Sequence, residues 1–234
     1  MKRFKILLYL ILVLPILSYR PFYSTDADVE EKKAIEIELG VMTISSWDEE
    51  TTLTSPSMVI NLGLGKGMEF VTEFKAVHTL NSLSIKNSQV KDVNVLLKGL
   101  LSEGILQGKR GVSIAMEGGL LLPTLRGEKP GAELIGIVSG KAANFTWHLN
   151  LGGFIEREGH KPGYFAGIIL ETPEYRRLRL VAEISYERVI EENEEKSFLI
   201  GVIYERENFA LDIAVRRGIA GDFFSITTGI TFGI

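Results

Sequence analysis

The 234-residue sequence contains no cysteine, so neither a disulfide framework nor a thiolate zinc site can form. It also has no Gly-x-Ser-x-Gly turn, no acidic loop with EF-hand spacing and no glycine-rich loop that leads into a helix. Proline is scarce, with 7 residues, whereas glycine is frequent, with 24. These absences argue against several common cofactor and catalytic sites, and we expect no cofactor and no metal centre.

The sequence has little continuous hydrophobicity, and its one long apolar run covers residues 6–17. That run contains Pro15 and is shorter than the roughly 20 residues that a membrane-spanning helix needs. Three basic residues precede it and a polar stretch follows, which is the pattern of a secretory signal peptide. Because Thr25-Asp26-Ala27 offers a small-x-small cleavage site, we expect a cleaved signal peptide over residues 1–27. The alternative is an uncleaved anchor helix.

The remaining chain, residues 28–234, has an excess of acidic side chains. Removal of residues 1–27 would leave 22 basic residues against 29 acidic ones. A negative protein of this kind repels the phosphate backbone, so the charge argues against nucleic acid as a partner.

The clearest pattern in the sequence is the alternation of residues 143–154. Since successive side chains of a strand point to opposite faces, the segment would be apolar on one face and polar on the other. The apolar row is Phe145, Trp147, Leu149 and Leu151, and the polar row is Asn144, Thr146, His148, Asn150 and Gly152. Its length is that of a tilted strand that crosses a bilayer.

Similar alternation recurs about twelve times and predicts an all-β fold, a transmembrane antiparallel up-and-down β-barrel. The expected strands cover residues 35–41, 58–64, 69–76, 92–101, 112–122, 132–140, 143–154, 163–171, 178–187, 198–205, 209–216 and 224–234. The hydrophilic stretches 43–56 and 79–91 are expected to be loops. Connections after even-numbered strands are mostly short and the others mostly longer, as in bacterial outer-membrane barrels with short periplasmic turns.

Charged residues fall on one phase of the strands, and because charges avoid lipid, this phase is expected to face the lumen. It could form an acidic passage for cations or neutral polar solutes, or a network of paired charges that closes the barrel. The lumen-lining candidates are Glu36, Glu38, Glu69, Glu73, Lys75, Lys98, Glu117, His148, Arg179, Glu183, Glu205, Asp212 and Arg216.

A soluble β-sandwich or a lipocalin-like barrel would show the same alternation with the two faces exchanged. The signal peptide, the sparse lysine on the polar phase and the small residues opposite the apolar phase (Gly63, Gly119 and Gly152 among them) favour a membrane. We therefore expect a location in the bacterial outer membrane, with outer-membrane lipid and lipopolysaccharide as partners and an unidentified small solute.

The three histidines give no convincing catalytic set. His148 is expected to face the lumen, His160 lies in a loop, and His78 is expected at the external rim with no serine opposite it. A hydrolase needs a nucleophile, a histidine within hydrogen-bond reach and an orienting group. The sequence therefore predicts a protein that is not an enzyme, and a lipid-modifying enzyme is the less favoured alternative.

Several short motifs resemble the MetA-pathway of phenol degradation family, a family of outer-membrane β-barrel proteins. The matching pieces are Ile37-Glu38-Leu39-Gly40, Ser55-Pro56, Asn61-Leu62-Gly63, Leu97-Lys98, Leu122-Pro123-Thr124, Asn150-Leu151-Gly152, Glu183 and Thr228-Gly229-Ile230-Thr231. Leu125 departs from the glycine that usually follows the Pro-Thr pair, and the chain ends in Ile234 where many outer-membrane barrels end in an aromatic residue. The resemblance implies uptake of small molecules, aromatic or apolar ones among them, through a narrow channel; a closed structural or binding barrel is the alternative.

Overall fold

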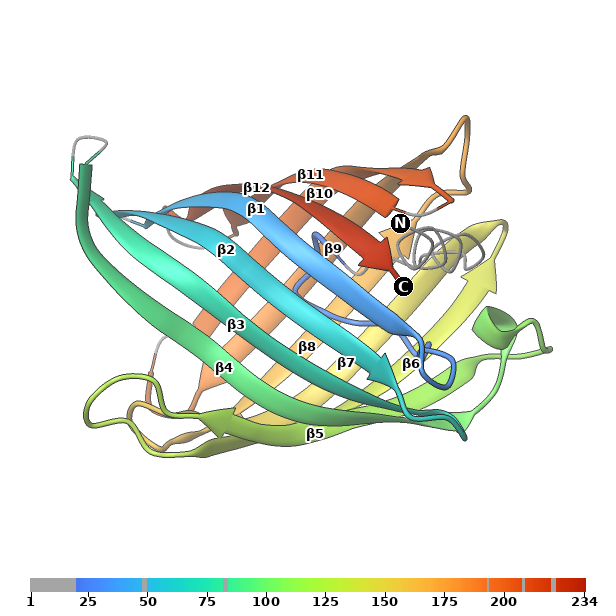
Figure 1. The fold of residues 1–234 in the computed structure, drawn as a ribbon, viewed down its shortest axis with the longest axis horizontal. Coiled ribbons are helices and arrows are strands. Elements are labelled where there is room, and N and C mark those ends of the chain that lie inside the picture. Colours follow the sequence, from blue (N-terminus) through green and yellow to red (C-terminus); the bar gives the residue numbers. More distant parts are fainter. Residues whose placement is uncertain (1–19, 48–49, 82–83, 193, 208, 220–221) are drawn as a thin grey trace, which may run out of the picture.

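The computed structural model describes residues 20–47, 50–81, 84–192, 194–207, 209–219 and 222–234, which form one closed antiparallel barrel of twelve strands (Figure 1). Each strand pairs with its neighbours in sequence, and β12 closes the barrel against β1 through pairs such as Ile37 with Phe232. The predicted fold class is confirmed. The strands are β1 (Ile35–Trp47), β2 (Glu50–Gly63), β3 (Met68–Asn81), β4 (Ser84–Ser102), β5 (Ser113–Leu122), β6 (Gly131–Ala142), β7 (Phe145–Ile155), β8 (Pro162–Glu171), β9 (Leu178–Val189), β10 (Glu194–Arg206), β11 (Phe209–Gly218) and β12 (Phe224–Gly233).

The barrel carries apolar side chains on its outer face and polar side chains inside. On β7, Leu151 is 57% exposed whereas the next residue inward by phase, Asn150, is completely buried. Large apolar residues that are more than half exposed recur around the wall at Leu97, Leu120, Leu134, Leu180, Ile184, Ile200 and Ile213. A soluble barrel would bury that face, so the arrangement fits a wall in contact with lipid. Among the residues that the structure describes, no helix is long and apolar enough to span a membrane.

The first four strands extend well beyond the segments predicted from alternation. The stretches 43–56 and 79–91, predicted as loops, are mostly strand, paired for example through Thr43 with Thr54 and Val77 with Gln89. These predictions were wrong because a ladder in water needs no apolar face, so alternation fades while β-favouring threonine, valine and isoleucine continue. Only residues 48–49 separate β1 from β2, and only residues 82–83 separate β3 from β4.

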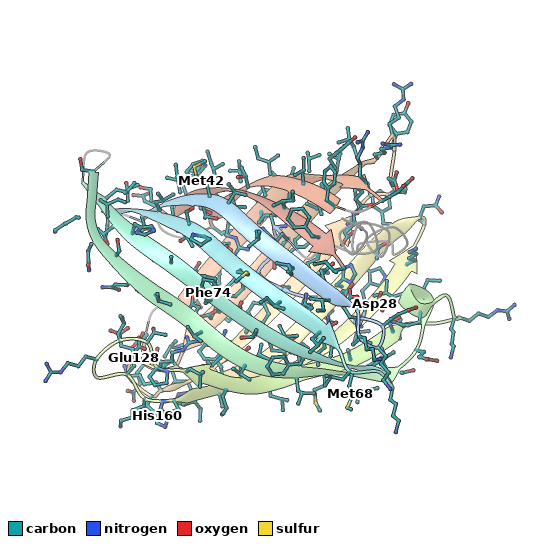
Figure 2. All side chains as sticks on the ribbon, in the orientation of Figure 1. Asp28, Met42, Met68, Phe74, Glu128 and His160 are labelled. Atoms are coloured by element: carbon teal, nitrogen blue, oxygen red, sulfur yellow. The ribbon has the colours of Figure 1, made fainter. Side chains whose placement is uncertain are left out.

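The two ends of the barrel differ in what lies there. Figure 2 shows Glu128 and His160 in the connections at one end and Asp28 and Met68 at the other. The Asp28 end also holds the single short helix of the described chain, the 3₁₀-helix η1 (Ile105–Gln107), between β4 and β5. The sequence predicts that this end is periplasmic because its connections are short. The predicted difference in length does not hold, because the connections after β1 and β3 at the opposite end are two residues each whereas residues 103–112 separate β4 from β5.

The outer face gives a direct test of lipid contact. Replacement of Leu151 by arginine, near the middle of β7, should lower the free energy of unfolding by about 2–4 kcal/mol, because the charge would lie at the bilayer midplane. Phe145→Arg, at the end of the same strand, is the matched control and should cost at most about 1 kcal/mol. Urea titration of the protein folded into phospholipid vesicles measures both. Equal costs at the two positions would contradict the lipid-facing assignment.

Candidate functional site

The lumen contains part of the chain itself, residues 20–33, which precede β1 and which we name the inner segment. Figure 1 shows it as the blue trace inside the ribbon of strands. By hydrogen bonds or side-chain packing it reaches all twelve strands of the barrel. The wall residues, from β1 to β12 in order, are Glu38, Ser57, Glu69, Lys98, Ala115, Ser139, Asn150, Phe165, Glu183, Ile203, Asp212 and Thr227.

Arg20 begins the inner segment and binds across the seam where β12 meets β1. Its backbone amide donates to Glu38 Oε2 at 3.1 Å, and its Nε donates to Asp212 Oδ2 at 3.3 Å. The terminal guanidinium nitrogens donate to Ser57 Oγ at 3.2 Å and Thr227 Oγ1 at 2.9 Å. Because these partners come from β1, β2, β11 and β12, one residue connects the first and last strands of the barrel.

Glu183 on β9 anchors the next part of the inner segment. Its carboxylate, 1% exposed, accepts the backbone amides of Tyr23 at 2.9 Å and Ser24 at 2.8 Å, and it also accepts Arg216 Nη2 at 2.9 Å. The Tyr23 ring packs edge-on against Phe165, with 5.3 Å between ring centroids. Charge-assisted bonds of this kind are about twice as strong as neutral ones.

Lys98 on β4 holds the inner segment against the opposite wall. Its Nζ lies 3.4 Å from Asp26 Oδ1 and 4.0 Å from Glu69 Oε1, and all three side chains are 4% exposed. Nearby, Gln107 of η1 donates from Nε2 to the Ala27 carbonyl at 3.1 Å and to Asp28 Oδ1 at 2.9 Å. Asp26 of the segment therefore meets a cation of the wall, as a buried ion requires, and Asp28 meets a neutral amide.

The thirteen lumen candidates divide by burial. Eight are buried, namely Glu36, Glu38, Glu69, Lys98, Glu117, His148, Glu183 and Asp212. The other five, Glu73, Lys75, Arg179, Glu205 and Arg216, are partly buried. Many of them pair with one another or with the inner segment, and Lys75 bonds Asp92 Oδ2 at 3.1 Å.

His148 belongs to a second polar cluster, on the wall between β6 and β10. Its Nδ1 lies 2.8 Å from Ser139 Oγ and its Nε2 lies 3.2 Å from Glu171 Oε1. Arg179 continues the chain, at 2.7 Å from Glu171 and 2.5 Å from Glu205. The order serine, histidine, carboxylate matches a hydrolase triad, but Ser139 is completely buried and accepts the amide of Ala27 at 2.9 Å. No substrate carbonyl can reach it in this state.

His78 also has a serine partner, contrary to the sequence prediction. Its Nδ1 lies 2.8 Å from Ser88 Oγ across the β3–β4 pair, and its Nε2 lies 2.9 Å from the Ser55 carbonyl. The prediction failed because residues 79–91 were expected to be a loop, which hid the pairing of His78 with Ser88. The Ser88 amide, the natural oxyanion donor, is taken by Asn87 Oδ1 at 2.9 Å. The pair therefore lacks one part of a hydrolytic site.

Two cavities lie beside the inner segment. The larger, about 440 Å³, extends from the β7–β8 connection at Arg157 to Glu69 and Lys98. The smaller, about 20 Å³, is lined by Glu36, Glu30 and the wall residues that it shares with the larger one. Asn61, Glu69 and Lys98 border both cavities, so the two cavities lie next to each other at these residues.

The sequence analysis assigns residues 20–27 to the leader, so it makes no prediction of the inner segment as part of the lumen. It also missed Glu171 and Asn150 as partners, although both lie on the inward phase of their strands. The alternation of β7 and β8 could have predicted that these two side chains face the lumen. Nothing in the local pattern of residues 20–27 indicates where a segment without strand or helix periodicity will lie.

Two carboxyl groups of the inner segment, Asp26 and Glu30, have raised pKa values. Burial, and next the Glu69 carboxylate, raise the pKa of Glu30 to about 7, while burial raises the pKa of Asp26 to about 6 against the pull of Lys98. Both groups favour their protons in the docked segment. The contribution of these two groups to docking is therefore complete below their ordinary pKa values of 4.5 and 3.8 and is lost as pH rises through 6 to 7.

Amide hydrogen exchange of residues 20–30, corrected for the intrinsic rate, tests this pH dependence. The segment should open more often at pH 8 than at pH 5, and Glu30→Gln should reduce the difference. Slower opening at pH 8 would contradict the assigned sign.

Replacement of Lys98 by methionine should destabilise the barrel by about 3 kcal/mol, because it leaves buried carboxylates without their cation. The control is Lys109→Met, which breaks an ion pair with Glu103 in which the lysine is 60% exposed. An exposed pair contributes at most about 1 kcal/mol. Urea unfolding in vesicles compares the two variants, and similar values would show that the Lys98 cluster has no special role in stability.

No protein-family model and no curated protein matches the sequence. Solved structures do match its fold. The COG4313 outer membrane channel from Pseudomonas putida F1 has a TM-score of 0.61 at 8% identity, covering 94% of this chain and 100% of that one. The KdgM porin has a TM-score of 0.58 at 10% identity, covering 84% and 98%, respectively. The translocator domain of the autotransporter NalP from Neisseria meningitidis has a TM-score of 0.51 at 10% identity, covering 88% of this chain and 90% of that one. These similarities establish the fold as that of an outer-membrane barrel.

Proposed function

We propose that this protein is a narrow outer-membrane channel for small neutral or cationic molecules. The observation that carries the proposal is the cavity of about 440 Å³ inside the barrel, whose charged lining is mostly acidic. Its acids are Glu38, Glu69, Glu73, Asp92, Glu117, Glu133, Glu156 and Glu187, and its bases are Arg20, Lys75, Lys98 and Arg157. A lumen with this excess of carboxylates attracts cations and repels anions.

Aromatic side chains line the same cavity and widen the range of solutes. Phe22, Tyr23, Phe74, Phe154 and Phe165 all border it. Aromatic faces attract cations and also pack against the rings of a ligand. A small molecule with an aromatic or apolar part therefore fits this lining, in agreement with what the resemblance to the MetA-pathway of phenol degradation family implies.

The similar structures support this class of function. One is described as a porin and another as an outer membrane channel. Membership of the MetA-pathway family, export through a cleaved leader, and contact with outer-membrane lipid and lipopolysaccharide are parts of the same proposal. The exposed apolar band of the wall supports the lipid contact.

The passage narrows at Asn61, Glu69 and Lys98, where the cavity of about 440 Å³ adjoins one of about 20 Å³. The smaller cavity is lined by Asp26, Asp28 and Glu30 of the inner segment. A solute that leaves the larger cavity toward the Asp28 end must displace these residues from Lys98 and the wall. Conduction should then consist of brief openings rather than a steady wide pore.

A second candidate function is a closed structural or binding barrel. The observation in its favour is the inner segment, whose contacts reach every strand of the barrel. In that case, the charges of the lumen would stiffen the wall and no solute would cross.

Planar-bilayer recording distinguishes the two functions. The channel should give reproducible single-channel steps, and its reversal potential in a potassium chloride gradient should show a preference for cations. Vesicles that contain the protein should swell faster in a pentose than in a trisaccharide. Absence of both steps and swelling, from protein that is folded by gel mobility, would instead establish the closed barrel.

The cation preference should depend on carboxylates of the larger cavity. The double variant Glu156→Gln and Glu187→Gln removes two carboxylates from its lining and should shift the reversal potential toward the chloride equilibrium potential. The control is Glu103→Gln, whose side chain is 50% exposed between β4 and η1. An unchanged reversal potential in the double variant would show that ions do not pass along this lining.

A further inference from the structure

We propose that the mature protein retains residues 20–27 and that any leader is removed on the N-terminal side of Arg20. The inner segment is then a permanent internal part of the barrel. The site Thr25-Asp26-Ala27, which the sequence favours for cleavage, is not used. Ser18 is a small residue that directly follows the apolar run and lies on the N-terminal side of Arg20, so a cut after it would leave residues 20–27 in the mature chain.

The first argument is that wall amides and hydroxyls have their partners in residues 20–27. Asn150 is completely buried, accepts the Thr25 amide at 3.0 Å and donates to the Thr25 carbonyl at 2.7 Å. Ser139, also completely buried, accepts the Ala27 amide. Buried polar groups are paired in folded proteins, and here a cut after Ala27 would remove partners that the wall is built to meet.

The second argument concerns charge. Asp212, with a side chain 1% exposed, bonds Arg20, while Glu183 accepts the amides of Tyr23 and Ser24. Asp26 in turn is a counterion of Lys98. A barrel that began at Asp28 would lose all of these bonds at once. Asp212 would lose the cation that bonds it, while Glu183 would keep only Arg216 of its three partners.

The third argument is that glycines of the inner wall leave space for side chains of this segment. A Cβ at Gly229 would lie 2.1 Å from Arg20 Nε, and a Cβ at Gly167 would lie 2.0 Å from Ser24 Oγ. Neither glycine has a positive φ, so the backbone does not require glycine at these positions. The absence of a side chain instead leaves room for residues 20 and 24. The sequence of β8 and β12 is therefore fitted to the presence of the segment.

The fourth argument is that apolar residues of the inner segment pack on apolar residues of the wall. Ala27 is completely buried in a cluster with Ala115 and Ile137. Phe22 packs on a second cluster of Val181, Ile203 and Ala210 from the other side of the lumen. Removal of both residues would expose apolar wall groups to the water of the lumen.

The mass of the intact wild-type protein from the outer-membrane fraction tests retention directly. The expected first residue lies at or before Arg20. A first residue at any later position, Asp28 included, would overturn the proposal. The measurement does not depend on conductance, so failure of the channel function and failure of retention are separate results.

A cysteine pair tests the position of the retained segment in the membrane. The natural chain has no cysteine, so the double variant Ala27→Cys and Ala115→Cys places its only two thiols within one buried cluster. Oxidation of the folded protein should give a band of altered mobility after denaturation that reduction removes. The matched control is the double variant Ala27→Cys and Ala214→Cys. Ala214 lies on β11, outside the cluster that contains Ala27, so this variant should give no crosslinked band. Retention without the first crosslink would overturn the assigned position inside the barrel.

Discussion

In a bilayer, a strand must satisfy its backbone hydrogen bonds on both edges, because lipid offers no donors or acceptors. The structure meets this constraint by closure, and β12 pairs with β1 along its whole length, from Phe224 to Gly233. Closure fixes which face of every strand meets lipid and which meets the lumen. The exposed leucine and isoleucine rows and the buried carboxylates follow from that one condition.

The second constraint is that charges collected inside must find partners. Some of these charges pair with one another between strands, as Arg216 does with Glu183. The inner segment supplies much of the rest, since Arg20 meets Asp212 and Asp26 meets Lys98. The segment thus contributes both to stability and to the size of the passage. A change that loosens it to widen the lumen also removes counterions from the wall, which links permeation to pH and to stability.

The sequence predicted the twelve-stranded barrel and the polarity of its two faces, because alternation is a local property that each strand carries by itself. It did not predict the extended ends of β1 to β4, since strands in water need no apolar row. Nor did it reveal the pairing of Glu171 with His148, which depends on the register between β7 and β8. The place of residues 20–27 was hidden most completely, because their order comes from contacts with strands distant in sequence.

Cell fractionation combined with gel mobility before and after boiling tests the central claim, a closed barrel in the outer membrane with lipid outside and polar groups inside. The account predicts that the protein sediments with the outer membrane and migrates differently before boiling than after it. A soluble periplasmic protein with the same mobility under both conditions would contradict the account, because the apolar rows would then have to form a core.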